Sequence, residues 1–128
     1  SKYFDYADLL ESHHEMKVDA PSGTALSIAE SMIEGRGKGF EQNVADLQTL
    51  DGTRGGDFQG INVHSARMPG RVARHEVVFG ALGQTLTMIH DSINRESFMP
   101  GVMLGVKDVV GRSELVVGLA SVLGLDKP

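Results

Sequence analysis

Cysteine is absent from this chain of 128 residues. Its absence excludes disulfides, thiolate metal ligands and a cysteine nucleophile, and it is compatible with a reducing cytoplasm. Positive charge is also scarce, because 12 lysines and arginines stand against 17 aspartates and glutamates, which gives a net charge of -5. A chain with this balance is a poor candidate for non-specific binding to nucleic acid or to a membrane surface.

Long apolar runs are missing as well. No run approaches the roughly 18 residues that span a bilayer. The N-terminal sequence SKYFDYADLL has no apolar stretch behind a basic start, so it does not resemble a secretory signal. Hydrophobic residues nevertheless make up 41% of the chain, and its length is sufficient for one domain with a real core. We therefore expect a cytoplasmic globular domain with no membrane partner.

The first half of the chain predicts one strand followed by one amphipathic helix. Leu9 and Leu10 lie in YADLLESHH, which we expect to form a strand. Ser22 is a favourable residue for capping the start of a helix. Apolar residues then recur at the spacing of one helical face: Ala25, Ile28, Ala29, Met32 and Ile33. We expect this helix to end near Gly35, before a long polar connection over residues 36–60.

The second half predicts three strands and a second helix. The strand candidates are GINVHSARM, RHEVVFGAL and QTLTMIHDSI, and Gly83 between the last two suits a tight hairpin. A helix is predicted from about Glu96 to Val110, with Pro100 tolerated only in its first turn. The order of the elements indicates an α+β domain with a small sheet, either mixed or antiparallel. We expect the apolar tail ELVVGLASVLGL to pack against another surface.

The stretch ESHHEMKVDAPSGTA, residues 11–25, contains an anion-binding pattern. Ser22, Gly23 and Thr24 fall where the helix begins, and the free N–H groups and positive dipole of a helix start favour a carboxylate or phosphate. Gly23 allows close approach to the backbone, and Thr24 adds a hydroxyl donor. Simple capping by Ser22 would account for the same residues, so this segment alone leaves both interpretations open.

Two adjacent histidines and a lysine precede this pattern. In an extended strand, His13 and His14 point to opposite sides, so both serve one site only if the chain bends or if they meet different parts of it. A neighbouring cation disfavours the charged form of a histidine or a lysine. Lys17 and a nearby histidine are therefore predicted to lose protons more readily, which suits general-acid work near neutral pH.

Other kinds of site fit the sequence less well. The five histidines are His13, His14, His64, His75 and His90. They lack HExxH spacing and no thiolate is present, so a metal site is not predicted. Ser22, His14 and Asp19 are the residue types of a hydrolase triad, but Ser22 lies in APSGT and not in GxSxG. The glycine-rich segments GRGKG and RGGDFQG match neither of the common phosphate-loop patterns.

The motif ESHHEMKVDAPSGTA closely resembles the signature of dihydrodipicolinate reductase (4-hydroxy-tetrahydrodipicolinate reductase) of bacterial lysine and diaminopimelate biosynthesis. Two later stretches, ARMPGRVARHEVVFGALGQTLTMIHDSINRESFMPGV and ELVVGLASVLGL, resemble the same family, so the resemblance covers nearly the whole chain. It implies an α+β substrate domain with a mixed four-stranded sheet and flanking helices. It also implies a homotetramer formed through the sheets.

The resemblance implies a reaction and a set of residues. In this family, a hydride passes from NADPH or NADH to a cyclic dicarboxylate, 4-hydroxy-tetrahydrodipicolinate, and gives tetrahydrodipicolinate. His13 matches the catalytic histidine of the family, and Lys17 matches its proton-donating lysine. The residues matched to substrate binding are His14, Gly23 and Thr24, with Ser22 assisting through the helix terminus and Arg95 near the substrate.

The Rossmann domain of this family, with its glycine-rich fingerprint, has no counterpart in the sequence. We therefore expect residues 1–128 to be the substrate-binding, catalytic and tetramerisation domain of a longer enzyme, whose other domain holds most of the NADPH or NADH. We expect residues from about 113 to 128 to pack on that domain, and the isolated chain to be inactive. The alternative is a stand-alone dicarboxylate-binding or scaffold module without reductase activity.

Overall fold

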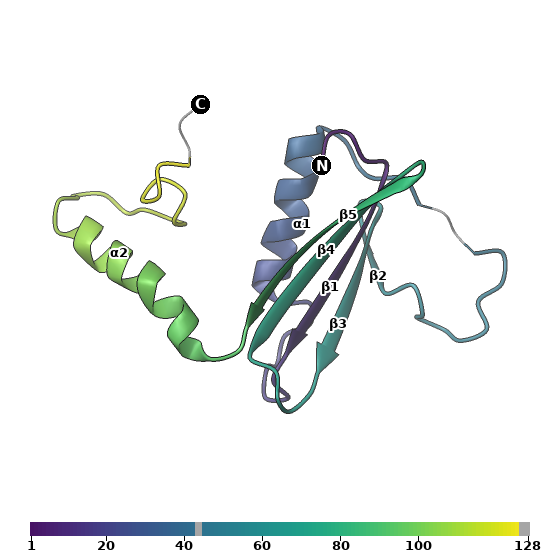
Figure 1. The fold of residues 1–128 in the computed structure, drawn as a ribbon, viewed down its shortest axis with the longest axis horizontal. Helices are drawn as coiled ribbons and strands as arrows, with labels where there is room; N and C mark the ends of the chain where they lie inside the picture. Colours follow the sequence, from purple (N-terminus) through teal and green to yellow (C-terminus); the bar gives the residue numbers. More distant parts are fainter. Residues whose placement is uncertain (43–44, 126–128) are drawn as a thin grey trace. The chain divides into compact units, whose positions relative to one another are not determined.

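A five-stranded mixed sheet is the centre of the first of two units in the structure. The structure, a computed structural model, describes residues 1–42 and 45–125. It divides into a unit Ser1–Ile93 and a second unit that begins at Asn94. The elements of the first unit are β1 (Tyr6–His13), α1 (Gly23–Arg36), β2 (Gly56–Phe58), β3 (Ile61–Arg67), β4 (Ala73–Ala81) and β5 (Gln84–Ser92) (Figure 1).

The strands lie in the order β2-β3-β1-β4-β5 across the sheet. β1 runs parallel to β3 and antiparallel to β4, and the pairs β2–β3 and β4–β5 are antiparallel. The predicted α+β class with a mixed sheet is therefore confirmed, but the predicted strand number of four is wrong. The additional strand, β2, has only three residues and lies inside the polar connection 36–60, where it is too short to show an alternating pattern.

The ends of the predicted elements are close to those observed. α1 ends at Arg36, slightly beyond the predicted Gly35, because the left-handed residue that closes it is Gly37, with φ of 79°. Ser22 caps the start of α1 as predicted, since its side chain accepts a hydrogen bond from the N–H of Ala25. The hairpin between β4 and β5 turns at Gly83, whose φ is 73°.

The core of the first unit lies between the sheet and α1, which runs along one face of it (Figure 1). Alternation along β1 puts Ala7 and Leu9 into this core and leaves Leu10 on the opposite face, where its side chain is partly exposed. The same alternation continues to Glu11 and His13, which are buried on the α1 side near the end of β1. The pattern that builds the core thus also positions two polar side chains beyond it.

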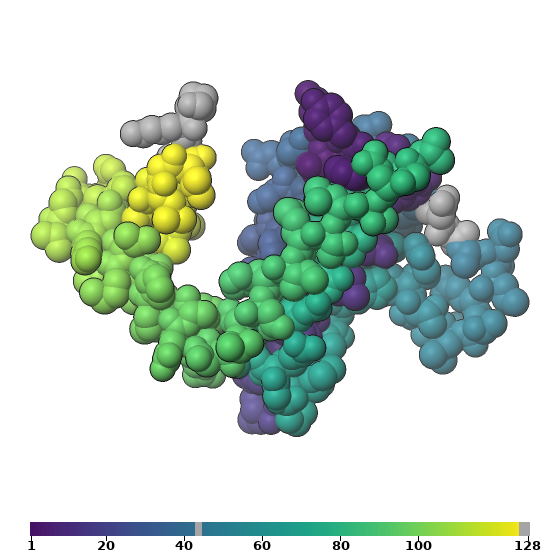
Figure 2. All heavy atoms as spheres, in the orientation of Figure 1, coloured from purple at the N-terminus to yellow at the C-terminus, as the bar shows by residue number. Residues whose placement is uncertain are grey.

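Much of the apolar surface of the first unit remains uncovered in the structure. Figure 2 shows β5 at the near surface of this unit along most of its length. Leu86 and Met88, which point to the α1 side of β5, are about half exposed, and so is Ile89 on the other side. The face of the sheet opposite α1 also carries the partly exposed Tyr6 and Leu10.

The second unit contains a short 3-10 helix, η1 (Arg95–Phe98), followed by α2 (Met99–Val109). Pro100 lies in the first turn of α2, as the sequence predicts, and the predicted start at Glu96 falls in η1. Beyond α2, Leu115 and Val117 are each 90% exposed. What covers residues 113–128 stays a prediction, and the last three of these positions lie outside the described residues. None of the described helices is long and apolar enough to cross a membrane.

Candidate functional site

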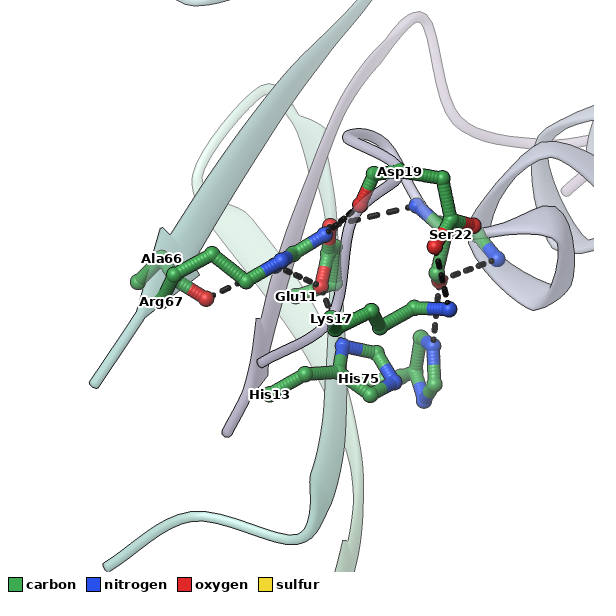
Figure 3. Close-up of polar contacts among 9 residues, drawn as sticks. Glu11, His13, Lys17, Asp19, Ser22, Ala66, Arg67 and His75 are labelled. Carbon is green, nitrogen blue, oxygen red and sulfur yellow. Dashed lines mark hydrogen bonds and ion pairs between the residues drawn. The ribbon is translucent and has the colours of Figure 1, made fainter. Parts of the chain in front are cut away.

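The buried carboxylate of Glu11 is the centre of a polar cluster near the end of β1. Its Oε1 accepts hydrogen bonds from Arg67 Nη2 at 2.8 Å and from the Ser22 N–H at 3.2 Å. Its Oε2 accepts from Arg67 Nη1 at 2.9 Å and lies 2.6 Å from His13 Nδ1 (Figure 3). The Glu11 side chain is entirely shielded from solvent, and 18% of the Arg67 side chain is exposed.

The register of the sheet explains why these side chains meet. In the parallel pair of β1 and β3, His13 lies opposite Arg67, and in the antiparallel pair of β1 and β4, Glu11 lies opposite His75. Residues directly opposite each other on neighbouring strands point to the same face. All four side chains therefore gather on the α1 side of the sheet.

Glu11 is held in its ionised form. Burial by itself raises the pKa of Glu11, but hydrogen bonds from Arg67, Ser65 and His13, together with the charge of Arg67, outweigh burial and lower the pKa to about 2. A carboxylate that accepts several hydrogen bonds beside a guanidinium is stabilised in this way. Glu11 is therefore a fixed negative charge at neutral pH.

His75 joins the cluster through the start of α1. Its Nε2 lies 3.2 Å from Ser22 Oγ, and its ring meets the His13 ring edge-on with 5.3 Å between the centroids. Burial and then the charge of His13 lower the pKa of His75, with smaller lowering by other cations, including Lys17, and an opposing contribution from Glu11. The easier deprotonation that the sequence suggested for Lys17 and a neighbouring histidine stays a prediction.

The loop between β1 and α1 carries Lys17 and Asp19, which pair with each other. Lys17 Nζ lies 2.7 Å from Asp19 Oδ1. The hydrogen bond from Lys17 is the main cause that lowers the pKa of Asp19, and the backbone N–H groups of Asp19 and Gly23 contribute. A carboxylate beside the first residue of α1 is therefore stabilised by an ammonium group and a helix N–H. The carbonyl of Asp19 also accepts a hydrogen bond from Arg67 Nη2 at 2.5 Å, which ties the loop to the cluster.

The chain bends immediately after β1, which is one of the two arrangements that the adjacent histidines left open. β1 ends at His13, and the N–H of Lys17 donates to the carbonyl of His14 in the turn that follows. His13 is buried on the sheet, whereas His14 is half-buried in the loop. The two histidines are thus separated by a bend rather than placed on opposite faces of one strand.

Six of the seven predicted site residues lie within this part of the first unit. They are His13, His14, Lys17, Ser22, Gly23 and Thr24. Gly23 and Thr24 are exposed in the first turn of α1, and Thr24 also lines a pocket of about 540 Å³ between α1, β4 and β5. Arg95 belongs to η1 in the second unit. The roles of all seven residues stay predictions.

Sequence reasoning did not assign Glu11, Arg67 or His75 to the site. Glu11 stands two positions before His13, so strand alternation already places both on one face. Arg67 and His75 lie more than 50 positions away from their partners Glu11 and Ser22, so no local pattern links them to the motif.

The contacts in the structure also test the two other kinds of site considered from the sequence, a hydrolase triad and a metal site. The hydrolase grouping of Ser22, His14 and Asp19 is not formed, because Ser22 contacts His75 and Asp19 pairs with Lys17. Among residues 1–42 and 45–125, no group of three or more histidine, cysteine, aspartate or glutamate side chains could hold a metal ion.

The fold and the cluster define an α+β domain with a carboxylate-anchored histidine beside a helix start. Residues 1–123 match the family model described as dihydrodipicolinate reductase, C-terminus. The chain belongs to this family of reductase C-terminal domains.

Individual relatives agree with the family model. The chain is 47% identical over 123 residues to the 4-hydroxy-tetrahydrodipicolinate reductase of Shouchella clausii (strain KSM-K16), a match that covers 96% of this chain and 47% of that protein. It is 52% identical over 124 residues to the reductase of the same name from Streptococcus pneumoniae (strain Hungary19A-6), covering 96% of this chain and 48% of that protein. The chain thus spans about half the length of the curated relatives it matches.

A solved structure has the same fold. It is described as dipicolinate-bound dihydrodipicolinate reductase from Paenisporosarcina sp. TG-14. The TM-score is 0.80 with 42% sequence identity, and the match covers 94% of this chain and 45% of that one. At this identity, the likeness extends to sequence as well as to fold.

Proposed function

We propose that this chain is the substrate-binding half of a cytoplasmic 4-hydroxy-tetrahydrodipicolinate reductase of lysine and diaminopimelate biosynthesis. The observation that carries the proposal is the pairing of the Asp19 carboxylate with the Lys17 ammonium and the Gly23 N–H, close to the buried His13. The same donors suit one carboxylate of a cyclic dicarboxylate. The solved relative from Paenisporosarcina is dipicolinate-bound, which supports this class of ligand.

In this proposal, the start of α1 binds the substrate. The N–H groups of Gly23 and Thr24 and the Thr24 hydroxyl donate to one carboxylate, and the dipole of α1 adds to the attraction. Ser22 assists by capping the helix, and His14 completes the pairing. A substrate carboxylate competes with Asp19 for Lys17, so binding requires Lys17 to exchange one carboxylate for another. Arg95, in the second unit, contributes a further cation near the substrate.

His13 and Lys17 carry the proton chemistry in this proposal. NADPH or NADH supplies the hydride when bound. The sequence has neither common glycine-rich phosphate pattern, so we assign most of the nucleotide binding to the remainder of a full-length enzyme. Lys17 donates the proton that balances the hydride, the 4-hydroxyl group of the substrate leaves as water, and His13 donates or accepts a proton beside it. We therefore expect the isolated chain to bind substrate analogues without turning substrate over.

Binding of pyridine-2,6-dicarboxylate to the isolated chain is the direct test. We expect a dissociation constant between micromolar and millimolar, equivalent to about 8 down to 4 kcal/mol, which a few charge-assisted hydrogen bonds can supply. Binding should weaken with added salt. It should also weaken in the double variant Thr24→Val, Lys17→Met. Titration calorimetry and NMR shift mapping measure both effects.

The control for this test is the double variant Thr53→Val, Lys38→Met, which changes the same residue types at exposed positions elsewhere. It should bind as the unaltered chain does. A ligand that shifts only residues 67–75, and leaves residues 13–24 unaffected, would place the anion site elsewhere.

We further propose that the chain forms a homotetramer through the sheet face opposite α1. The partly exposed Tyr6, Leu10 and Ile89 support this, since an uncovered apolar sheet face is a common contact surface. Leu10→Arg should dissociate the assembly, while the new side chain can pair with Glu76, directly opposite on β4, and so preserve the fold. Sedimentation equilibrium measures the mass.

Val18→Arg is the matched control for assembly, because Val18 is fully exposed in the loop between β1 and α1 and not on a strand of the sheet. It should leave the mass unchanged. A monomeric unaltered chain at high micromolar concentration contradicts the tetramer.

A further inference from the structure

The carboxylate of Glu11 has no capacity left for a ligand. Each of its oxygens has two partners: Arg67 and the Ser22 N–H at Oε1, and Arg67 and His13 at Oε2. Its side chain is also completely shielded from solvent. Glu11 therefore cannot touch a substrate, and any influence on chemistry passes through the groups it holds. Of these, only His13 exchanges protons near neutral pH.

The contacts of Glu11 decide which nitrogen of His13 carries a proton. An ionised carboxylate only accepts hydrogen bonds, so the 2.6 Å contact requires a proton on His13 Nδ1. The other contacts of Glu11 also come from donors, two on Arg67, one on Ser22 and one on Ser65, and these keep the carboxylate ionised. In neutral His13, the unprotonated nitrogen is then Nε2.

The charged groups around His13 reinforce this arrangement. His75, the other ring of the cluster, contacts Ser22 and not Glu11. Arg67 faces Glu11 from β3, and Lys17 is paired with Asp19 in the loop. The ring of His13 thus contacts the one negative side chain of the cluster on its Nδ1 side and the edge of another ring nearby.

We infer that Glu11 is a positioning residue: with Arg67, it holds the His13 ring with a proton on Nδ1, and so makes Nε2 the atom that exchanges protons. This role rests on the proposed function, in which His13 works as an acid or base. In this role Glu11 orients a group that reacts, in addition to linking β1 to the start of α1 through the Ser22 N–H.

Nitrogen NMR of histidine-labelled chain tests the tautomer directly, without any variant. Above the pH at which His13 loses its charge, we expect its signals to show a protonated Nδ1 and an unprotonated Nε2. In Glu11→Gln, the mixture should shift towards a protonated Nε2, because the ionised acceptor is gone. Glu34→Gln, an exposed change on α1, is the control and should leave the His13 signals unchanged.

Kinetics of the full-length reductase test the consequence. In catalytic triads, replacing an orienting carboxylate by an amide lowers kcat roughly 10⁴-fold. Because Lys17 shares the proton work, we expect a smaller loss in Glu11→Gln, about 10–10³-fold in kcat with little change in KM. The pH dependence of kcat should change as well, because the removed carboxylate faces the ring proposed to exchange the proton. A residue that only joined β1 to α1 would not move this profile.

The outcomes separate this inference from the proposed function. A neutral His13 that carries its proton on Nε2 in the unaltered chain overturns the inference, whatever the activity. A Glu11→Gln enzyme that is folded and keeps both kcat and pH profile also overturns it. A full-length protein without reductase activity, in a chain whose His13 is protonated on Nδ1, overturns the proposed function instead.

Discussion

Lys17→Met should lower kcat of the full-length reductase roughly 10²–10⁴-fold, the usual contribution of a group that transfers a proton in the transition state. Methionine retains an unbranched side chain of similar reach but removes the ammonium group, so packing changes little and the proton donor is lost. His13→Ala should have an effect of the same size. The measurement is the initial rate of NADPH or NADH oxidation with saturating substrate and purified full-length variants.

Lys38→Met is the matched control, because Lys38 is exposed beyond the end of α1. It should retain normal turnover. For Lys17→Met we also expect KM to rise, because the same ammonium group pairs with a substrate carboxylate in the proposed site. Near-normal turnover in both Lys17→Met and His13→Ala removes the proposed catalytic roles. A full-length protein that binds dicarboxylate but never oxidises the nucleotide favours the alternative of a stand-alone binding module.

The order of the elements could be predicted because each element has a local pattern. The alternation in RHEVVFGAL and QTLTMIHDSI, with Gly83 between them, leads directly to the β4–β5 hairpin. Pairing between distant strands has no such local pattern. The parallel pairing of β1 with β3 follows from how the intervening α1 crosses the sheet. The order of the elements alone left a mixed and an antiparallel sheet open, and only the family resemblance implied a mixed one. β2 was missed because three residues are too few to show the alternation of apolar and polar side chains that identifies a strand.

The candidate site likewise contains residues that a local pattern predicts and residues that only strand pairing brings together. The motif residues from His13 to Thr24 are contiguous, so one stretch of sequence identified them together. Glu11 and Arg67 are 56 positions apart, and Ser22 and His75 are 53 apart. These pairs meet only because the registers of β1 with β3 and with β4 align them. Residues that act through a neighbouring strand are therefore found from the structure, even where they stand beside the motif, as Glu11 does.

The ion pair of Glu11 and Arg67 should dominate the stability of this end of the sheet. Arg67→Met removes both guanidinium hydrogen bonds and leaves the shielded Glu11 carboxylate without its cation. Breaking a buried pair in this way typically lowers the free energy of unfolding by about 3–5 kcal/mol. Urea unfolding of the chain at neutral pH measures the loss. Arg71→Met is the matched control, because Arg71 pairs with Asp91 at the surface, where an ion pair contributes at most about 1 kcal/mol.

Acid should reduce the difference between Arg67→Met and the unaltered chain. The folded pKa of Glu11, about 2, lies below the ordinary value of 4.5, so its ionised form stabilises the fold above pH 4.5. This contribution is lost as the pH falls from 4.5 through 2. Arg67→Met raises the folded pKa of Glu11, so the variant loses less stability over the same range.

The double variant Glu11→Gln, Arg67→Met isolates the charge. It should be more stable than Arg67→Met alone, because no buried charge remains unpaired. Two results would contradict the assignment: a loss in Arg67→Met no larger than in Arg71→Met, or a loss that is independent of pH between 5 and 2, the range around the two pKa values of Glu11. Either result would mean that the hydrogen bonds of Ser65, Ser22 and His13 keep Glu11 ionised without its arginine.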